Sequence, residues 1–83
     1  MIFQGTKKVI RVGTSCAVFI DSGWEIETGT VVNIRVRHQD GTNEAFGTKK
    51  LSNMGRKSRV IYLDKNWGFK AGEWVNFELM ERE

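Results

Sequence analysis

The stretch Gly5-Thr6-Lys7-Lys8 recurs as Gly47-Thr48-Lys49-Lys50, 42 positions further along the chain. One residue is then inserted, and the offset becomes 43 for the rest of the repeat. At that offset polar, aromatic and glycine residues coincide: Ser15 with Ser58, Asp21 with Asp64, Trp24 with Trp67, Gly29 with Gly72 and Asn33 with Asn76. The 83 residues therefore contain two copies of one unit, 5–37 and 47–80, joined by residues 38–46.

A unit of this length rarely buries a core by itself, because a short chain removes too little apolar surface from water. We therefore expect residues 1–83 to form one domain in which the two copies complete each other. Such a domain has internal pseudo-two-fold symmetry, like a homodimer whose subunits have been fused.

Alternating apolar residues predict a half-buried strand at the end of each copy, over 31–37 and 74–80. Further strands are expected over 17–20, 60–63, 7–12 and 49–54. Asp40-Gly41 predicts a hairpin turn, because glycine adopts positive φ readily. The expected fold is mostly β, a small barrel formed by the two repeats together.

One short helix is expected in each copy, after the second strand. Asp21-Ser22 and Asp64-Lys65 have the character of N-caps, because a side-chain oxygen there can accept a hydrogen bond from a free amide of the first turn. The helices must be brief, since Gly29 and Gly72 follow closely.

The composition, with 40% hydrophobic residues, three Trp and five Phe, suits a packed core. No apolar run is long enough to span a bilayer, no signal-peptide pattern begins the chain, and the single Cys16 excludes an intramolecular disulfide. These features predict a cytoplasmic location. With one His and one Cys, the common zinc sites are excluded, and no cofactor is expected.

Charge is distributed unevenly. Residues 1–20 and 47–63 carry eight Lys and Arg and no Asp or Glu, whereas the rest of the chain carries five positive and ten negative residues. The two-fold relation would bring the two basic parts to one face. Charged segments are often merely solvated, but the recurrence in both copies favours a face that binds a polyanion.

Two motifs resemble those of the AbrB/MazE/SpoVT swapped-hairpin family. The stretch from Val12 to Asp21, VGTSCAVFID, is similar to that family's W-G-N-S-x-A-V-x-I-P pattern. The stretch from Trp67 to Val75, WGFKAGEWV, resembles its W-G-L-K-x-G-D-x-V pattern, and both motifs occur in both copies. In that family two chains interlace β-hairpins into one barrel that binds DNA.

The resemblance implies a single-chain version of that dimer, a transcriptional regulator of the cytoplasm or nucleoid that prefers particular duplex sequences. The residues it implies lie on the first strands and the loops after them. Together with the basic residues of both copies, the expected DNA-binding set is Lys8, Arg11, Thr14, Ser15, Lys50, Asn53, Arg56, Lys57, Ser58 and Arg59.

The chain also departs from the family pattern. The proline after the second strand is replaced by Asp21 and Asp64. Positions that are often basic hold Phe19 and Tyr62, and likewise Ile10 and Ser52.

Several residues have alternative interpretations. The basic loop 55–59 can contact phosphates or simply be solvated. Phe19 and Tyr62 can stack on bases or form a second packed layer, and the packed layer is favoured. By strand alternation Trp74 faces away from Val75 and Phe77, so it can mark a contact with a second copy or a partner protein.

No Ser-His-Asp set, phosphate-binding glycine loop or catalytic carboxylate pair occurs, so we do not expect an enzyme. Cys16 is not expected to be a nucleophile. The leading hypothesis is binding of double-stranded DNA. The alternatives are an adaptor or antitoxin-like protein-interaction module and a module that binds RNA or single strands.

Overall fold

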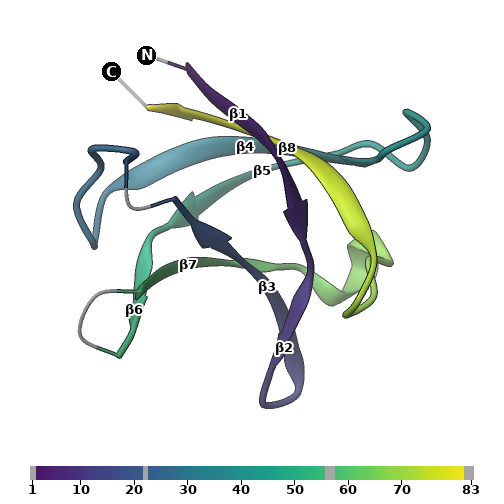
Figure 1. Cartoon of the computed structure of the whole chain (residues 1–83), viewed down its shortest axis with the longest axis horizontal. Helices are drawn as coiled ribbons and strands as arrows, with labels where there is room; N and C mark the ends of the chain where they lie inside the picture. The colour runs from purple at the N-terminus through teal and green to yellow at the C-terminus, as the bar shows by residue number, and fades with distance from the viewer. Residues whose placement is uncertain (1, 22, 56–57, 82–83) are drawn as a thin grey trace.

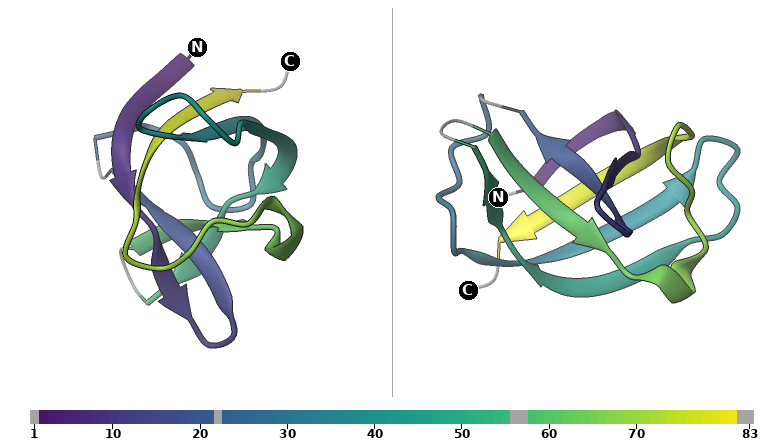
Figure 2. Two further views of the ribbon diagram at one scale, coloured as in Figure 1. Left: turned by 90° about the vertical axis from the view of Figure 1, so that its right-hand side faces the viewer. Right: turned by 90° about the horizontal axis from the view of Figure 1, so that it is seen from below.

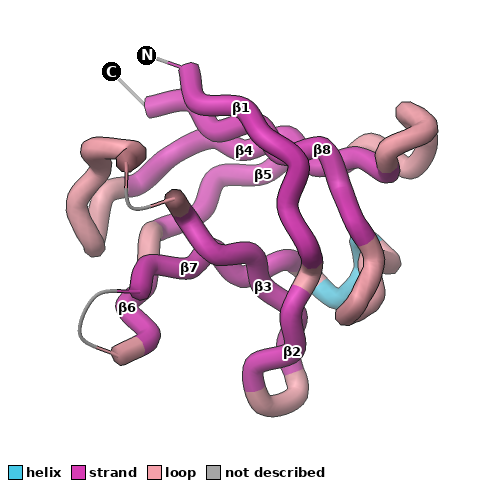
Figure 3. Tube along the Cα trace, viewed as in Figure 1, coloured by secondary structure: helices cyan, strands magenta, loops and turns pink. Residues whose placement is uncertain are grey.

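The structure is a computed structural model that describes residues 2–21, 23–55 and 58–81. Its regular elements are almost all strands, arranged as two separate four-stranded antiparallel sheets (Figures 1 and 3). Figure 2 shows from below that the strands of one sheet cross those of the other.

The upper sheet in Figure 1, called sheet A, has the strand order β1-β8-β4-β5. Its strands are β1 (Ile2–Lys8), β8 (Trp74–Glu81), β4 (Val31–His38) and β5 (Ala45–Lys50). The lower sheet, sheet B, has the order β2-β3-β7-β6. Its strands are β2 (Ile10–Val12), β3 (Ser15–Ile20), β7 (Ser58–Leu63) and β6 (Ser52–Met54).

The edge strands β1 and β2 are the two parts of one bent segment, and β5 and β6 are the equivalent parts in the second copy. The bends fall at Val9 and Leu51, both buried. The N–H of Val9 donates to the carbonyl of Glu73 at 2.9 Å, and its own carbonyl accepts from Gly72 at 2.7 Å. Leu51 exchanges equivalent bonds with residues 29–30. Each copy therefore supplies strands to both sheets.

The two copies interlock. Strand β1 of the first copy pairs with β8 of the second, with Gly5 opposite Phe77. Strand β5 of the second copy pairs with β4 of the first, with Gly47 opposite Ile34. Neither copy pairs its own first strand with its own last strand, so the hydrogen bonds of sheet A join the two halves of the chain.

The strand register locates the pseudo-two-fold axis. In sheet A, Arg35 lies opposite Glu78, and in sheet B, Val18 lies opposite Ile61. Each of these pairs joins equivalent positions of the two copies. An axis through both pairs relates the copies, as the repeat predicts. In a homodimer each pair would join identical residues, whereas here Arg35 faces an opposite charge.

The core lies between the sheets and is built from both copies. Its largest fully buried side chains are Phe77, Ile34, Leu51, Ile61, Leu79, Val9, Val18, Val32, Val36, Val60 and Val75. Trp24 and Trp67 pack against the core at its margin, where Trp24 stacks on Phe3 with ring centroids 5.2 Å apart. Such shared burial is the main stabilising term in a domain of this size.

The mostly β fold is confirmed, but the predicted strands 7–12 and 49–54 are each interrupted by a bend, at Val9 and Leu51, and the two sheets do not close into one barrel. The two sheets form separate hydrogen-bonded ladders in an open arrangement. Strands β2 and β6 have only three residues each, and both are sheet edges.

The expected short helices are also wrong. Among the residues that the structure describes, the second copy has a single 3₁₀ turn, η1 (Lys65–Trp67), and the first copy has no helix. Asp64 makes no capping hydrogen bond, because its carboxylate pairs with Lys49 instead. Gly68 then leaves the helical conformation at φ 80°. A single turn with so few hydrogen bonds does not extend into a longer helix, because helix nucleation is unfavourable.

The hairpin at Asp40-Gly41 is confirmed, with Gly41 at φ 87°. The carboxylate of Asp40 accepts from the Thr42 hydroxyl at 2.6 Å and from the Thr42 N–H at 2.9 Å. The Thr42 hydroxyl, followed by its N–H, lowers the pKa of Asp40 below its ordinary value of 3.8. Among the described residues no helix has the length and apolar character needed to cross a membrane.

Candidate nucleic-acid interface

Sheet B contains no carboxylate in any of its strands or in its two hairpin turns. Its cations are Arg11 in β2 and Arg59 in β7, together with Arg56 and Lys57. Arg56 and Lys57 lie outside the described residues, so the structure gives no account of their predicted role. A sheet without acidic side chains does not repel a polyanion, which makes this side of the molecule the candidate interface.

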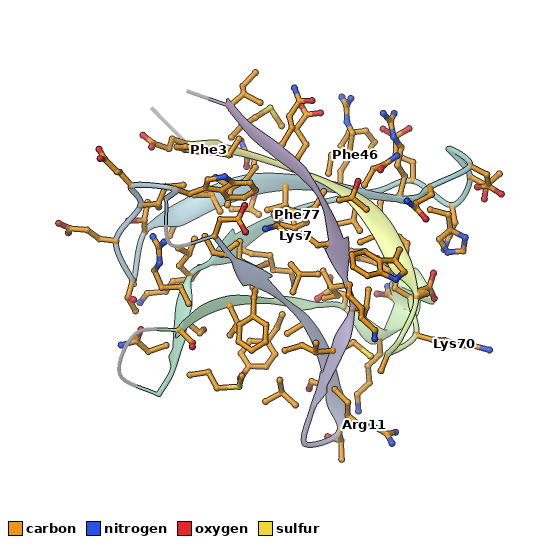
Figure 4. The ribbon with its side chains drawn as sticks, viewed as in Figure 1. Phe3, Lys7, Arg11, Phe46, Lys70 and Phe77 are labelled. Carbon is orange, nitrogen blue, oxygen red and sulfur yellow. The ribbon has the colours of Figure 1, made fainter. Side chains whose placement is uncertain are left out.

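Three of the predicted cations are exposed on the bent segments. Lys8 ends β1, Lys50 ends β5 at the equivalent position, and Arg11 lies in β2. None of the three forms an ion pair with a residue that the structure describes. Figure 4 shows Arg11 extending from the hairpin at the bottom of the molecule. These side chains are accessible to phosphates.

The two hairpins of sheet B begin with glycines in the left-handed conformation. Gly13 has φ 63° and Gly55 has φ 81°, and neither has a neighbour that an added Cβ would meet. Their positive φ, rather than lack of space, is therefore what requires glycine. Thr14 is exposed in the first turn, and Ser15 and Ser58 are half-buried where β3 and β7 begin.

The structure assigns Arg59 a different position from the exposed one that its sequence context suggests. Its guanidinium crosses to the first copy and donates to main-chain carbonyls of Asp21 and Trp24, both at 2.7 Å, and of Ile26. The equivalent position in the first copy is Cys16, so this contact has no symmetric counterpart. Arg59 therefore holds the loop before β4, and three of its five N–H groups are occupied by these carbonyls.

Asn53, also in the predicted set, is exposed in β6, but its side-chain carbonyl accepts from the Thr28 hydroxyl at 2.9 Å. This bond ties β6 to the loop of the first copy. The amide N–H groups of Asn53 remain for another partner.

Two of the eight clustered cations are neutralised within the fold. Lys7 pairs with Asp21 and lies 4.7 Å from the Trp24 ring centroid. The equivalent Lys49 pairs with Asp64 and lies 5.1 Å from the ring centroid of Trp67. The charge available to a ligand is therefore smaller than the sequence count implies.

The outer face of sheet B, which points away from sheet A, is uncharged over the described residues. Phe19 on β3 and Tyr62 on β7 face outward, because their strand neighbours Val18 and Ile61 are buried in the core. Phe19 is 40% exposed and Tyr62 is half-buried. They pair in register with Val60 and Ala17, which are completely buried although they lie on this outer face. The aromatic pair thus combines some packing with accessible ring surface.

Groups suited to covalent or metal chemistry are scattered. Cys16 packs against the core, and His38 pairs with Glu73 at 2.9 Å beside the hairpin that joins the copies. Over residues 2–21, 23–55 and 58–81, no three His, Cys, Asp or Glu side chains gather closely enough to hold a metal ion.

Comparisons with protein-family models, with curated protein sequences and with solved structures give no match.

Proposed function

We propose that the protein binds double-stranded DNA, with some sequence preference, as a small transcriptional regulator. The observation that carries the proposal is the absence of carboxylates from sheet B beside the exposed Lys8, Arg11 and Lys50, which have no described counter-ion. The resemblance of both copies to the swapped-hairpin DNA-binding family points to the same ligand.

The proposed binding mode uses the two hairpins and the bent strands. Lys8, Arg11 and Lys50 pair with phosphates and release counterions, which supplies most of the affinity. The hydroxyls of Thr14, Ser15 and Ser58 donate to phosphate oxygens and fix the position of the protein on the duplex. The major groove of B-DNA is wide enough for a two-stranded ribbon such as β2–β3 or β6–β7.

The test is the salt dependence of binding to a fluorescent duplex, measured by anisotropy. Arg11→Met should reduce the slope of log K against log salt by about 0.9 if it removes one phosphate contact. Arg37→Met is the matched control, because it removes one cation from β4 of sheet A and leaves sheet B unchanged. Equal slopes for the two variants would contradict the proposal.

A second candidate, binding of single-stranded nucleic acid or RNA, is favoured by one observation. The outer face of sheet B has accessible aromatic rings at Phe19 and Tyr62 and no described cation. Bases can stack on such rings, and each stacked base contributes about 1–3 kcal/mol.

The two candidates separate in a competition assay. If single strands are the ligand, Phe19→Leu and Tyr62→Leu should weaken binding of an unpaired oligonucleotide roughly 5-fold or more each, as the loss of 1–3 kcal/mol implies. If the duplex is the ligand, unpaired competitors should displace it poorly, and both substitutions should leave duplex affinity nearly unchanged.

A further inference from the structure

The outer face of sheet A, which points away from sheet B, gathers most of the exposed large apolar side chains of the described chain. Strand alternation places Ile2, Val31, Phe46 and Trp74 on this face. Phe46 is 60% exposed and Trp74 is 52% exposed. In Figure 4, Phe46 lies in the upper part of the molecule and Arg11 at the bottom, so most of this face lies away from the hairpins of sheet B. Only its Lys8 and Lys50 ends, at the bends into β2 and β6, adjoin the candidate nucleic-acid interface. Exposed apolar side chains gathered on one face mark a contact surface.

Two pockets of nearly equal size lie on this face. The first, called the Arg37 pocket, has a volume of about 330 Å³ and includes Gln4, Thr6, Arg37 and Asn76 in its lining. The second, called the Phe46 pocket, has a volume of about 340 Å³ and includes Phe46, Thr48, Asn33 and Met80.

The pockets are pseudo-symmetric copies of one another. Thr6 and Asn76 of the Arg37 pocket are equivalent to Thr48 and Asn33 of the Phe46 pocket. In both pockets the threonine hydroxyl meets the asparagine carbonyl oxygen, at 3.4 Å in the first and 2.8 Å in the second. The Thr–Asn hydrogen bond is therefore common to the two copies.

The remaining positions have diverged in chemistry. Gln4 is replaced by Phe46 at the equivalent position, and Arg37 by Met80. The Arg37 pocket is consequently polar, and its charged lining residues are Arg35, Arg37 and Glu78, two positive and one negative, whereas the described lining of the Phe46 pocket has no charged residue and is mainly apolar. A homodimer must present two identical pockets, but a fused chain is free to differentiate them for a ligand with two different ends.

The guanidinium of Arg37 is the group in the first pocket that lacks a counter-ion. Its neighbour Arg35 is already compensated, since it pairs with Glu44 at 3.0 Å and with Glu78 at 3.8 Å. Arg37 is half-buried and makes no ion pair with any described carboxylate. A partly desolvated guanidinium favours a carboxylate, to which it can donate two parallel hydrogen bonds.

The geometry points to a protein partner: an extended acidic segment that places a carboxylate in the Arg37 pocket and an apolar side chain in the Phe46 pocket. The charge of the face suits this partner, because Lys8, Arg35, Arg37 and Lys50 share it with Glu78, and Glu44 stands at its edge. The Lys8 and Lys50 ends of the face add attraction for acidic side chains on either side.

The strand spacing sets the separation of the two partner side chains. On β8, Asn76 marks the Arg37 pocket and Met80 marks the Phe46 pocket, four residues apart. At about 3.3 Å per residue this is roughly 13 Å. An extended partner therefore spans both pockets with side chains four residues apart, which point to the same side because the separation is even.

The test uses a blocked heptapeptide of serines and threonines with glutamate at position 2 and leucine at position 6, titrated into the ¹⁵N-labelled full chain. We expect amide shifts in β1, β4, β5 and β8 and about tenfold weaker binding when glutamine replaces the glutamate, as the loss of a charged hydrogen bond implies. Arg37→Met should remove this preference for glutamate, and Lys70→Met, an exposed cation off this face, should retain it.

Three results would overturn the inference. One is equal binding of the glutamate and glutamine peptides by the unmodified protein. Another is the absence of shifts on sheet A at about 5 mM peptide, where a ligand of millimolar Kd would occupy most of the site. The third is concentration-dependent broadening of these amides without peptide, which would assign the face to a second copy. Arg37→Met should leave duplex binding unchanged, so this inference and the proposed function fail independently.

Discussion

Replacing Arg59 by methionine should lower the free energy of unfolding strongly, although this half-buried side chain contributes little to the protein surface. The side chain donates hydrogen bonds to three carbonyls of the loop between Asp21 and Ile26, which would otherwise lack these donors. Methionine keeps much of the length of the apolar stem but cannot donate. The loss should therefore appear in the free energy of unfolding.

Hydrogen bonds from a charged donor contribute about 1.5–3 kcal/mol each. Two of the three bonds are part-buried and the third, to Asp21, is exposed, so we count about 1.5 kcal/mol for each of the two part-buried bonds and none for the exposed one. We expect a loss of about 3 kcal/mol in the free energy of unfolding. In a domain of this size that corresponds to a decrease in Tm of roughly 12–24 °C.

Urea denaturation followed by tryptophan fluorescence measures the loss, because Trp24 lies in the affected loop. Arg11→Met is the matched control, an identical substitution at an exposed residue of the same sheet, and it should change stability by less than about 0.5 kcal/mol. If Arg59→Met costs less than about 1 kcal/mol, the loop does not depend on this guanidinium and the reasoning is wrong.

Other substitutions test further details of the structure. Gly47→Ala should lower the free energy of unfolding by about 1–3 kcal/mol in urea denaturation, since an added Cβ would lie 2.7 Å from Cζ2 of Trp67. The equivalent Gly5→Ala should be tolerated, because the nearest atom to its added Cβ is 3.7 Å away. Equal effects of the two substitutions would contradict the packing of Trp67 on Gly47. Thr42→Ala should raise the pKa of Asp40 toward 3.8 in an NMR titration, because the hydroxyl is the largest cause of the lowered value. Because the pKa of Asp40 is lower in the folded state, its ionised carboxylate stabilises the folded protein at pH values above the unfolded-state pKa. This stabilisation is lost as the pH falls through the folded-state pKa. In Thr42→Ala the stabilisation is smaller, so the free energy of unfolding should decrease less over the same pH range.

Much of the fold can be predicted from the internal repeat and from the alternation of apolar and polar residues along the strands. The alternation over 31–37 and 74–80 identifies the two central strands of sheet A, and six alternate apolar residues of these strands are buried: Val32, Ile34, Val36, Val75, Phe77 and Leu79. The short length of each copy explains why they interlock. Barrel closure could not be predicted, because it depends on hydrogen bonds between sheet edges that the sequence pattern does not determine.

The expected helices fail for a local reason. A carboxylate at a helix start can cap the first turn, but Asp64 has a competing partner in Lys49, which the pairing of β5 with β4 brings within reach. In the first copy Gly23 occupies the position equivalent to Asn66, and glycine disfavours helix further. Whether Asp64 caps a helix or pairs with Lys49 therefore depends on tertiary contacts, which the local sequence does not show.

The basic loop in which Arg59 stands predicts that this residue contacts DNA. Strand alternation contains the opposite signal, since Arg59 has the same parity as Ile61 and Leu63, which face the core. Its partners are carbonyls 33–38 residues away, and main-chain acceptors leave no mark in a sequence. The two pockets on sheet A could not be predicted from the sequence either, because the lining of each one comes from three strands that belong to both copies.

The interlocked pairing of the two copies is the central claim, and backbone NOEs in the full-length chain test it most directly. In the interlocked arrangement Gly5 lies opposite Phe77, and Gly47 lies opposite Ile34. If each copy folded on itself, the same repeat register would place Gly5 opposite Ile34 and Gly47 opposite Phe77. We expect cross-strand NOEs between β1 and β8 and between β4 and β5. NOEs between β1 and β4, or between β5 and β8, would contradict the account.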